Sequence, residues 1–170
     1  MSPTPLQAAI NEAPERATVG DQRAEEEYFV FQVGDLTLGA PSNQVREVTR
    51  LGPITPLPRA PAFVMGVVGH RGDVVPLVDL LRFFAQGEMK PGSRSRFFIG
   101  ESGGQRVGFL TDTLLGLRKI YVADRIQAPM GSGAQSEFVT GLVQLKDIPA
   151  LSLLDLSRII ASARARVVAR

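Results

Sequence analysis

The chain contains one long motif twice, in segments that begin about 75 residues apart. Residues 63–84 and residues 138–160 share one order of residue types. Each has an aromatic residue, Val, a Gly two positions later, aliphatic residues, a basic residue, a Pro, an Asp-Leu pair, and an Arg before two large apolar residues. A repeat of this length indicates a fold built from two related halves, not a catalytic domain built around one cleft.

Short strand-like segments separated by turn residues fill most of the chain. Residues 28–33 are aromatic and β-branched, reach the turn pair Gly34-Asp35, and lead to a returning strand over residues 36–39. Residues 96–110 repeat that scheme at an offset of about 69. Many short strands with only short helices favour β-barrels, and the repeat predicts two barrels related by a pseudo-twofold axis.

The middle of the chain is punctuated by proline and glycine. Four prolines between residues 53 and 61 predict an extended loop. Strands are expected at 63–68 and 74–78, joined across residues 69–73, and Pro76 predicts an edge strand or a bulge. Residues 43–48 fit either a helical turn or the start of a strand, because their period does not separate the two.

Asp79 and Asp155 occupy equivalent places in the two repeats, each just before an apolar segment with helical spacing. They could be read as paired catalytic carboxylates. An N-cap explains both without any chemistry, so we favour two helix caps. The segment from Leu156 to Val167 is amphipathic and is expected to be a helix.

Composition and charge set the domain limits. The 170 residues suffice for one domain with a substantial core. We expect a flexible acidic tail at 1–26, a single domain at 27–160 and a basic helical tail at 161–170. The net charge is +2, and residues 28–160 carry only +3, spread along the sequence, which argues against nucleic acid as a partner.

The sequence lacks the residues that several classes of chemistry require. Cysteine is absent, which excludes thiolate chemistry, and no stretch approaches the length of a membrane span, so we expect a soluble intracellular protein. The single histidine, His70, has no partners at the spacing of a triad or a zinc site, and we expect it to be exposed in a turn. We therefore expect no enzymatic activity, no metal and no cofactor.

Arg71 lies between His70 and Gly72 on the turn predicted in the first repeat. Three interpretations stay open: a solvated turn arginine, a structural ion pair with an acid such as Glu47, and a direct contact with a partner. The last two can coexist. Val45 and the Met65-Gly66 pair are candidates for a binding groove, although core burial is the commoner role of such residues.

Residues 31–35, 45–48 and 61–80 resemble the CheW-like chemotaxis coupling domain, and residues 108–112, 126–129 and 138–142 continue the match, so that the resemblance covers residues 28–160. It implies an all-β fold of two intertwined five-stranded SH3-like barrels with short helices and no catalysis. It also implies two partners in the cytoplasm: the tip of a methyl-accepting chemoreceptor, at membrane-associated arrays, and the regulatory domain of a CheA-type histidine kinase.

The resemblance also assigns individual residues. Glu47 and Arg71 match an acid and an arginine that form an ion pair beside the receptor groove, and Val45, Val48 and Gly66 match positions of partner contact. The family's turn usually reads Asn-Leu-Arg-Gly, whereas this chain has Gly-His-Arg-Gly at 69–72, so an aliphatic residue is replaced by a histidine. The partner preference at that turn is therefore open.

Two other functions stay under consideration. One is a coupler for pilus or gliding motility instead of flagellar swimming, which the sequence does not decide. The other is a basic β-barrel that binds nucleic acid by stacking bases on exposed aromatic residues. Trp is absent and Tyr occurs only twice, so the aromatic residues for such a surface are few.

Overall fold

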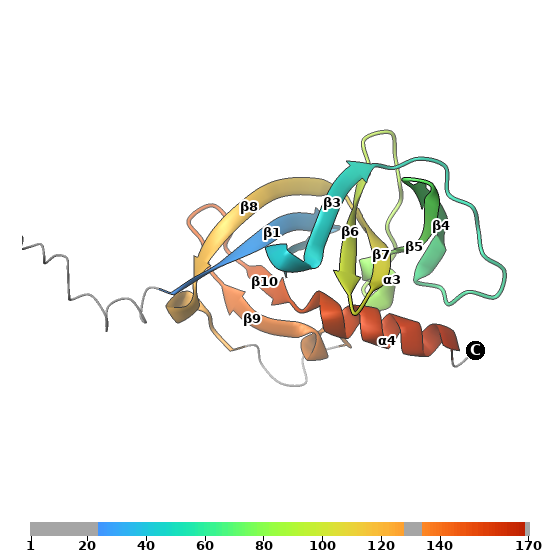
Figure 1. Ribbon diagram of the computed structural model, residues 1–170. Helices are drawn as coiled ribbons and strands as arrows, with labels where there is room; N and C mark the ends of the chain where they lie inside the picture. Colours follow the sequence, from blue (N-terminus) through green and yellow to red (C-terminus); the bar gives the residue numbers. More distant parts are fainter. Residues whose placement is uncertain (1–23, 128–133, 169–170) are drawn as a thin grey trace, which may run out of the picture.

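The computed structural model describes residues 24–127 and 134–168. Within them the chain forms ten strands and few, short helices (Figure 1). The strands are β1 (Glu25–Val33), β2 (Leu36–Pro41), β3 (Val45–Arg50), β4 (Val64–His70), β5 (Asp73–Val78), β6 (Arg96–Ser102), β7 (Gln105–Thr111), β8 (Thr113–Tyr121), β9 (Val139–Val143) and β10 (Leu151–Leu154). The helices are α3 (Leu80–Phe83), α4 (Leu156–Val168) and the 3₁₀ turns η1 (Ser42–Gln44), η2 (Val122–Asp124) and η3 (Ala134–Glu137).

The strands form two five-stranded sheets with the same internal order. Sheet 1 runs β8-β1-β2-β10-β9, and sheet 2 runs β3-β6-β7-β5-β4. The two sheets therefore correspond strand by strand: β8 with β3, β1 with β6, β2 with β7, β10 with β5, and β9 with β4. In each sheet one pairing is parallel, β10 with β2 and β5 with β7. The sequence repeat is thus a repeat of sheet architecture.

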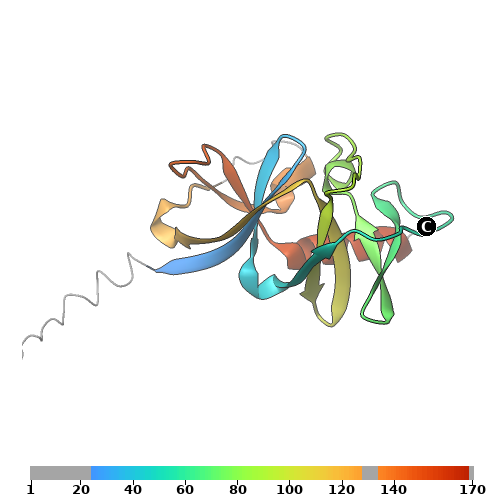
Figure 2. The ribbon, with the colours of Figure 1, turned by 90° about the horizontal axis from the view of Figure 1, so that it is seen from above.

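The two sheets lie side by side along the molecule, and α4 runs beneath sheet 2 (Figures 1 and 2). Sheet 1 takes two strands from before sheet 2 and three from after it, which confirms an all-β, intertwined arrangement. The expected closed SH3-like barrels are not confirmed, because the strand ladders leave β3 and β4, and β8 and β9, as sheet edges.

The edges of each sheet nevertheless meet at one isolated backbone bridge. In sheet 2, Thr55 and Val67 exchange hydrogen bonds of 2.9 and 2.8 Å; in sheet 1, Ile126 and Leu142 exchange bonds of 2.8 and 2.7 Å. In both cases the chain that follows one edge strand crosses over to the opposite edge strand. Each sheet is therefore curled, so that its two edges face one another.

The repeated glycines explain why the crossing segments come so close. A Cβ built on Gly66 would lie 2.4 Å from the carbonyl oxygen of Thr55, and Gly66 has a φ of +145°, which side chains rarely adopt. A Cβ on Gly141 would lie 2.3 Å from the side chain of Arg125. The glycine shared by the two copies of the motif is therefore a site of close packing.

The outer ends of the motif are also joined in both copies. The carbonyl of Phe63 accepts a hydrogen bond from the backbone N–H of Asp79 at 2.9 Å, and Phe138 does the same for Asp155 at 3.1 Å. The Asp79 carboxylate then accepts from the N–H of Arg82 at 3.1 Å and caps α3. Asp155 accepts from the N–H of Ser157 at 3.0 Å at the start of α4. The prediction of two helix caps is confirmed.

Other expectations are corrected in detail. The turn of the β4–β5 hairpin is two residues long, so that Gly69, His70 and Asp73 belong to strands. Pro76 is not on an edge strand, because β5 lies between β4 and β7 and begins its parallel pairing one residue later, at Leu77; the bulge lies in β4. The ambiguous segment 43–48 combines both options, a 3₁₀ turn followed by a strand.

The limits of the predicted segments can be compared with the elements. β1 begins at Glu25, while residues 1–23 of the expected tail lie outside the described residues. The helix α4 begins at Leu156 as expected and runs through the expected boundary at 160/161. Ile160 and Ala163 on either side of that boundary are both buried.

Aromatic rings join the two sheets into one core. The ring of Phe98 in sheet 2 lies 5.2 Å from that of Phe29 and 4.8 Å from that of Phe31, both in sheet 1. It also stacks on Phe109 at 5.2 Å. One large cluster of buried residues therefore draws on both sheets, with a smaller cluster confined to sheet 1.

Candidate functional site

The two edges of sheet 2 are joined by an ion pair between Glu47 on β3 and Arg71 in the β4–β5 turn. Arg71 Nε donates to Glu47 Oε1 at 2.9 Å, and Nη2 donates to Oε2 at 3.2 Å. The Arg71 side chain is 71% exposed and that of Glu47 is 33% exposed. We call this line of contact between the edge strands seam 2. It presents a guanidinium to solvent in a fixed orientation.

The tight turn places Arg71 at this position. Arg71 and Gly72 have φ values of 51° and 84°, the positive pair typical of a two-residue type I′ hairpin turn. Gly72 adopts such a value without strain, whereas a non-glycine residue rarely does. The two hydrogen bonds to Glu47 help to hold the arginine there.

Charge pairing shifts the titration of both groups. The hydrogen bond from Arg71 lowers the pKa of the Glu47 carboxyl below its usual value, and nearby His70 lowers it further. The same hydrogen bond raises the pKa of Arg71. The pair is therefore ionised at neutral pH. Because the folded pKa of Glu47 is depressed, its contribution to stability holds at neutral pH and is lost as the pH falls through that value.

His70 is not exposed, in contrast to the expectation from the sequence. It is the last residue of β4, and its side chain is only 8% exposed. Its Nε2 lies 3.3 Å from Oε1 of Glu47, within ion-pair range but without hydrogen-bond alignment. The prediction failed because the shortened turn moves His70 into the strand, where its ring faces the opposite sheet edge.

Sheet 1 has an equivalent seam with the charges exchanged. Arg118 on edge strand β8 donates to Asp147 in the β9–β10 connection at 3.1 and 2.6 Å. Here the arginine is on the strand and the acid is on the connection, and the acid is the more exposed, at 59% against 33%. We call this contact seam 1. The motif alignment gave no sign of it, because Arg118 and Asp147 do not match Glu47 and Arg71 in type.

The structure brings together only two of the five predicted contact residues, Glu47 and Arg71. Val45 is half-buried and packs against the core. Val48 is 36% exposed, but strand alternation turns it to the opposite face of β3 from Glu47. Gly66 is buried beneath Thr55. A role of Gly66 in partner contact is therefore one of shape.

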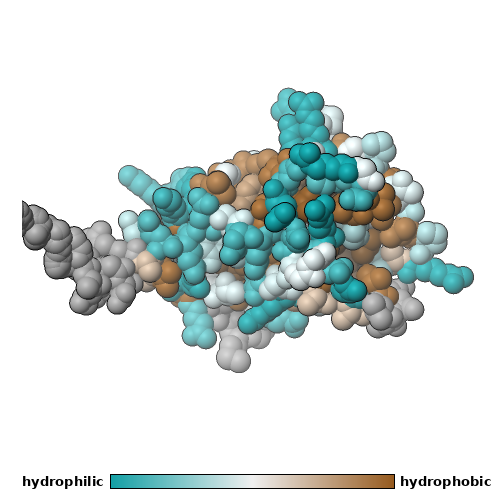
Figure 3. Space-filling model, viewed as in Figure 1, coloured by the Kyte–Doolittle hydropathy of each residue, from teal (hydrophilic) through white to brown (hydrophobic). Residues whose placement is uncertain are grey.

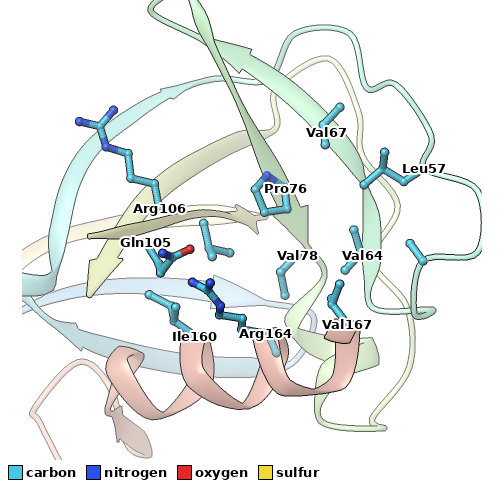
Figure 4. A pocket seen from close by; sticks show the side chains of 13 residues that line it. Leu57, Val64, Val67, Pro76, Val78, Gln105, Arg106, Ile160, Arg164 and Val167 are labelled. Atoms are coloured by element: carbon cyan, nitrogen blue, oxygen red, sulfur yellow. The ribbon is translucent and has the colours of Figure 1, made fainter. Parts of the chain in front are cut away.

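An apolar groove that the sequence did not predict opens between sheet 2 and α4 (Figure 4). Its volume is about 330 Å³. Its aliphatic lining comes from the proline-rich loop, β4, β5, β7 and α4, and includes Leu57, Val64, Val67, Val78, Ile160 and Val167. Arg106 and Arg164 add cations to the lining. These segments are distant in sequence, so no local pattern could have revealed the groove.

Exposed apolar residues gather over the sheet 2 half of the face shown in Figure 3. Few aromatic side chains are available for stacking on nucleic-acid bases. All nine phenylalanines are buried, and Tyr121 is the only exposed aromatic residue in the described part of the chain. This distribution does not favour a nucleic-acid surface. The apolar surface is aliphatic and suits protein contact.

Two further features of the described residues bear on function. Across residues 24–127 and 134–168 there is no cluster of three or more His, Cys, Asp or Glu side chains placed to hold a metal ion. The helices in these ranges are all too short or too polar to cross a membrane.

Comparison with known proteins identifies relatives of this fold. A family model described as the CheW-like domain matches residues 27–164. Protein FrzA of Myxococcus xanthus is 50% identical over 159 residues, which cover 93% of this chain and 99% of that protein. The chemotaxis protein CheW of Rhizobium meliloti (strain 1021) is 30% identical over 123 residues, 71% of this chain and 78% of that protein.

A solved structure is also similar. The crystal structure of the scaffolding protein TtCheW from Thermoanaerobacter tengcongensis aligns with a TM-score of 0.69 at 25% identity. The alignment covers 77% of this chain and 89% of that one. The side-by-side pair of five-stranded sheets therefore also occurs in a protein described as a scaffold.

Proposed function

This chain belongs to the CheW-like domain family, and on that premise we propose that it is a non-catalytic scaffold that couples methyl-accepting chemoreceptors to a CheA-type histidine kinase. The family is one of chemotaxis adaptors, which fits the names of the relatives and of the solved structure. The observation that carries the proposal is the Glu47–Arg71 pair, which lies at the positions where the resemblance places an ion pair beside a receptor groove.

We assign the receptor tip to the surface around seam 2. Its exposed guanidinium suits carboxylates and backbone carbonyls on a helical tip, because its five donors are held in a rigid fork. The exposed Val48 on the other face of β3, the half-buried Val45 and the surface shaped by Gly66 would extend the contact. The kinase regulatory domain would use a different face, and the protein would act in the cytoplasm at receptor arrays.

Barrel closure belongs to the same proposal. The isolated bridges and the two seam ion pairs already join the edges of each sheet. We infer that each curled sheet acts as an SH3-like barrel when partners dock. Side chains and a single bridge, instead of a full strand ladder, then hold each barrel shut.

The test is co-sedimentation with membranes that carry a chemoreceptor and the histidine kinase of the host organism. The full chain should pellet with receptor and kinase together and should raise the rate of kinase autophosphorylation. Val122→Ala, at an exposed residue of η2 in the sheet 1 half of the molecule, is a control that should behave as the unaltered chain. A chain that binds neither partner and leaves autophosphorylation unchanged would refute the proposal.

A further inference from the structure

The only histidine of the chain is enclosed at the proposed docking site. The His70 side chain is 8% exposed, and neither ring nitrogen has a hydrogen-bond partner among the described residues. Buried polar atoms in native proteins nearly always have a hydrogen-bond partner, so two ring nitrogens without one need an explanation. The resemblance indicates an aliphatic residue at this position, so the imidazole is not needed for packing.

One carboxylate oxygen of Glu47 lies between the side chains of Arg71 and His70. Glu47 Oε1 accepts from Arg71 Nε at 2.9 Å, and His70 Nε2 lies 3.3 Å from the same oxygen. Arg71 holds the second oxygen, Oε2, at 3.2 Å. His70 comes from β4 and Glu47 from β3, so the histidine, like the arginine, connects the two sheet edges.

Protonation of His70 changes this balance. A neutral imidazole carries one N–H and no net charge, so Arg71 remains the principal partner of Glu47. A protonated imidazole carries a proton on each nitrogen and a net positive charge. Nε2 then donates a charge-assisted hydrogen bond to Oε1 of Glu47. A carboxylate oxygen can accept two hydrogen bonds, so Nε2 does not displace Arg71 Nε directly. The positive charge of the ring instead offsets the charge of Glu47 and repels the guanidinium, which weakens the Arg71–Glu47 pair.

We propose that His70 is a positioning residue for Arg71, and that its protonation draws Glu47 toward β4 and frees the Arg71 guanidinium for an acidic docking partner. The docking half of this inference rests on the proposed function. The side-chain half concerns the isolated protein alone. Histidine is the side chain whose charge ordinarily changes between pH 5 and 8, so a test of the exchange spans that interval.

The charged groups that face the ring are few. Glu47 faces it from β3 and Arg71 from the turn, while Asp73 is its register partner on β5. Directly opposed residues of an antiparallel pair point to the same side of the sheet, so Asp73 adds a second acid on that side.

Nuclear magnetic resonance on the full chain tests the side-chain half, because a single histidine gives one unambiguous ring signal. Between pH 7.5 and 5.5, the His70 ring signal and the Arg71 Nε signal should change over the same pH interval. In Glu47→Gln the Arg71 signal should no longer follow the ring. An Arg71 signal that moves identically in the unaltered chain and in His70→Leu would overturn the inference.

Binding to a purified receptor tip tests the docking half. The unaltered chain should bind severalfold more tightly at pH 5.5 than at pH 7.5, and His70→Leu should bind equally at both. Asp147→Asn, which alters only seam 1, is the matched control and should keep the pH response. Equal binding by the unaltered chain at both pH values refutes the docking half. Binding at neither pH refutes the proposed function, while the resonance experiment still decides the role of His70.

Discussion

Arg71 combines an unfavourable backbone conformation with high exposure, an unusual pairing for a residue whose role is only structural. Its φ of 51° is rare for a side-chain-bearing residue, and 71% of its side chain is open to solvent. An ion pair this exposed adds little to stability, because water screens it. The arrangement therefore makes more sense as a presented contact than as a structural brace.

Arg71→Ala should weaken binding to the receptor tip about tenfold while leaving the melting temperature nearly unchanged. Titration calorimetry and a thermal scan measure the two effects. The matched control is Arg118→Ala, which removes the equivalent pair in seam 1 and should leave receptor binding intact. A large loss of thermal stability equal to the loss of binding would make Arg71 a structural residue.

Among the elements, β4 and β9 show how the repeat is used. Each carries the motif glycine at the point where the opposite edge of its sheet crosses over. The two glycines are not equally constrained. Gly66 faces the backbone of Thr55 and has a positive φ, whereas Gly141 faces the flexible side chain of Arg125.

Gly66→Ala should destabilise the protein by at least about 2 kcal/mol, since it combines backbone strain with a clash that no rotamer relieves. Gly141→Ala should cost less, because the Arg125 side chain can move aside. Gly69→Ala is the control on the same strand: its Cβ would meet only one atom, at 4.0 Å, and the change should stay within about 0.5 kcal/mol. Urea unfolding measures all three; equal costs for Gly66→Ala and Gly69→Ala would contradict the close-packing role.

At the scale of the elements, the sequence predicted the features that neighbouring residues in the chain determine. Short aromatic and β-branched segments bounded by turn residues predicted the strands, and Asp79 and Asp155 predicted both helix starts. Sheet membership was different, because pairing depends on contacts between distant segments. Pro76 shows the limit: the missing N–H suggested an edge strand, yet β5 is interior because its parallel pairing begins one residue later.

For the candidate site, charge type could be predicted and geometry could not. The Glu47–Arg71 pair was one of three interpretations of Arg71, and the structure contains it. His70 was placed wrongly because the turn has two residues instead of the expected five, which puts the side chain in the strand and encloses it. Seam 1 and the apolar groove depend on the way the two sheets curl, which the linear pattern does not contain.

The whole molecule is joined by the ring of Phe98, which is fully buried and touches both sheets. Phe98→Ala should cost about 3–5 kcal/mol, the usual range for a buried phenylalanine. Amide hydrogen exchange should show protection falling together in β1–β2 and β6–β7, since one core serves both sheets. Val122→Ala, at an exposed residue, is the control and should leave exchange unchanged. A loss of protection confined to sheet 2 would show that the sheets unfold separately.

The nesting of one sheet within the other has a consequence for synthesis. Sheet 2 is built from one continuous stretch, β3 to β7, whereas sheet 1 needs β1 and β2 from before that stretch and β8 to β10 from after it. As the chain leaves the ribosome, all strands of sheet 2 emerge while the first hairpin still lacks its neighbours on both sides. The open edges of β1 and β2 stay uncovered until β8 and β10 appear, so the earliest-made strands are the last to be fully paired.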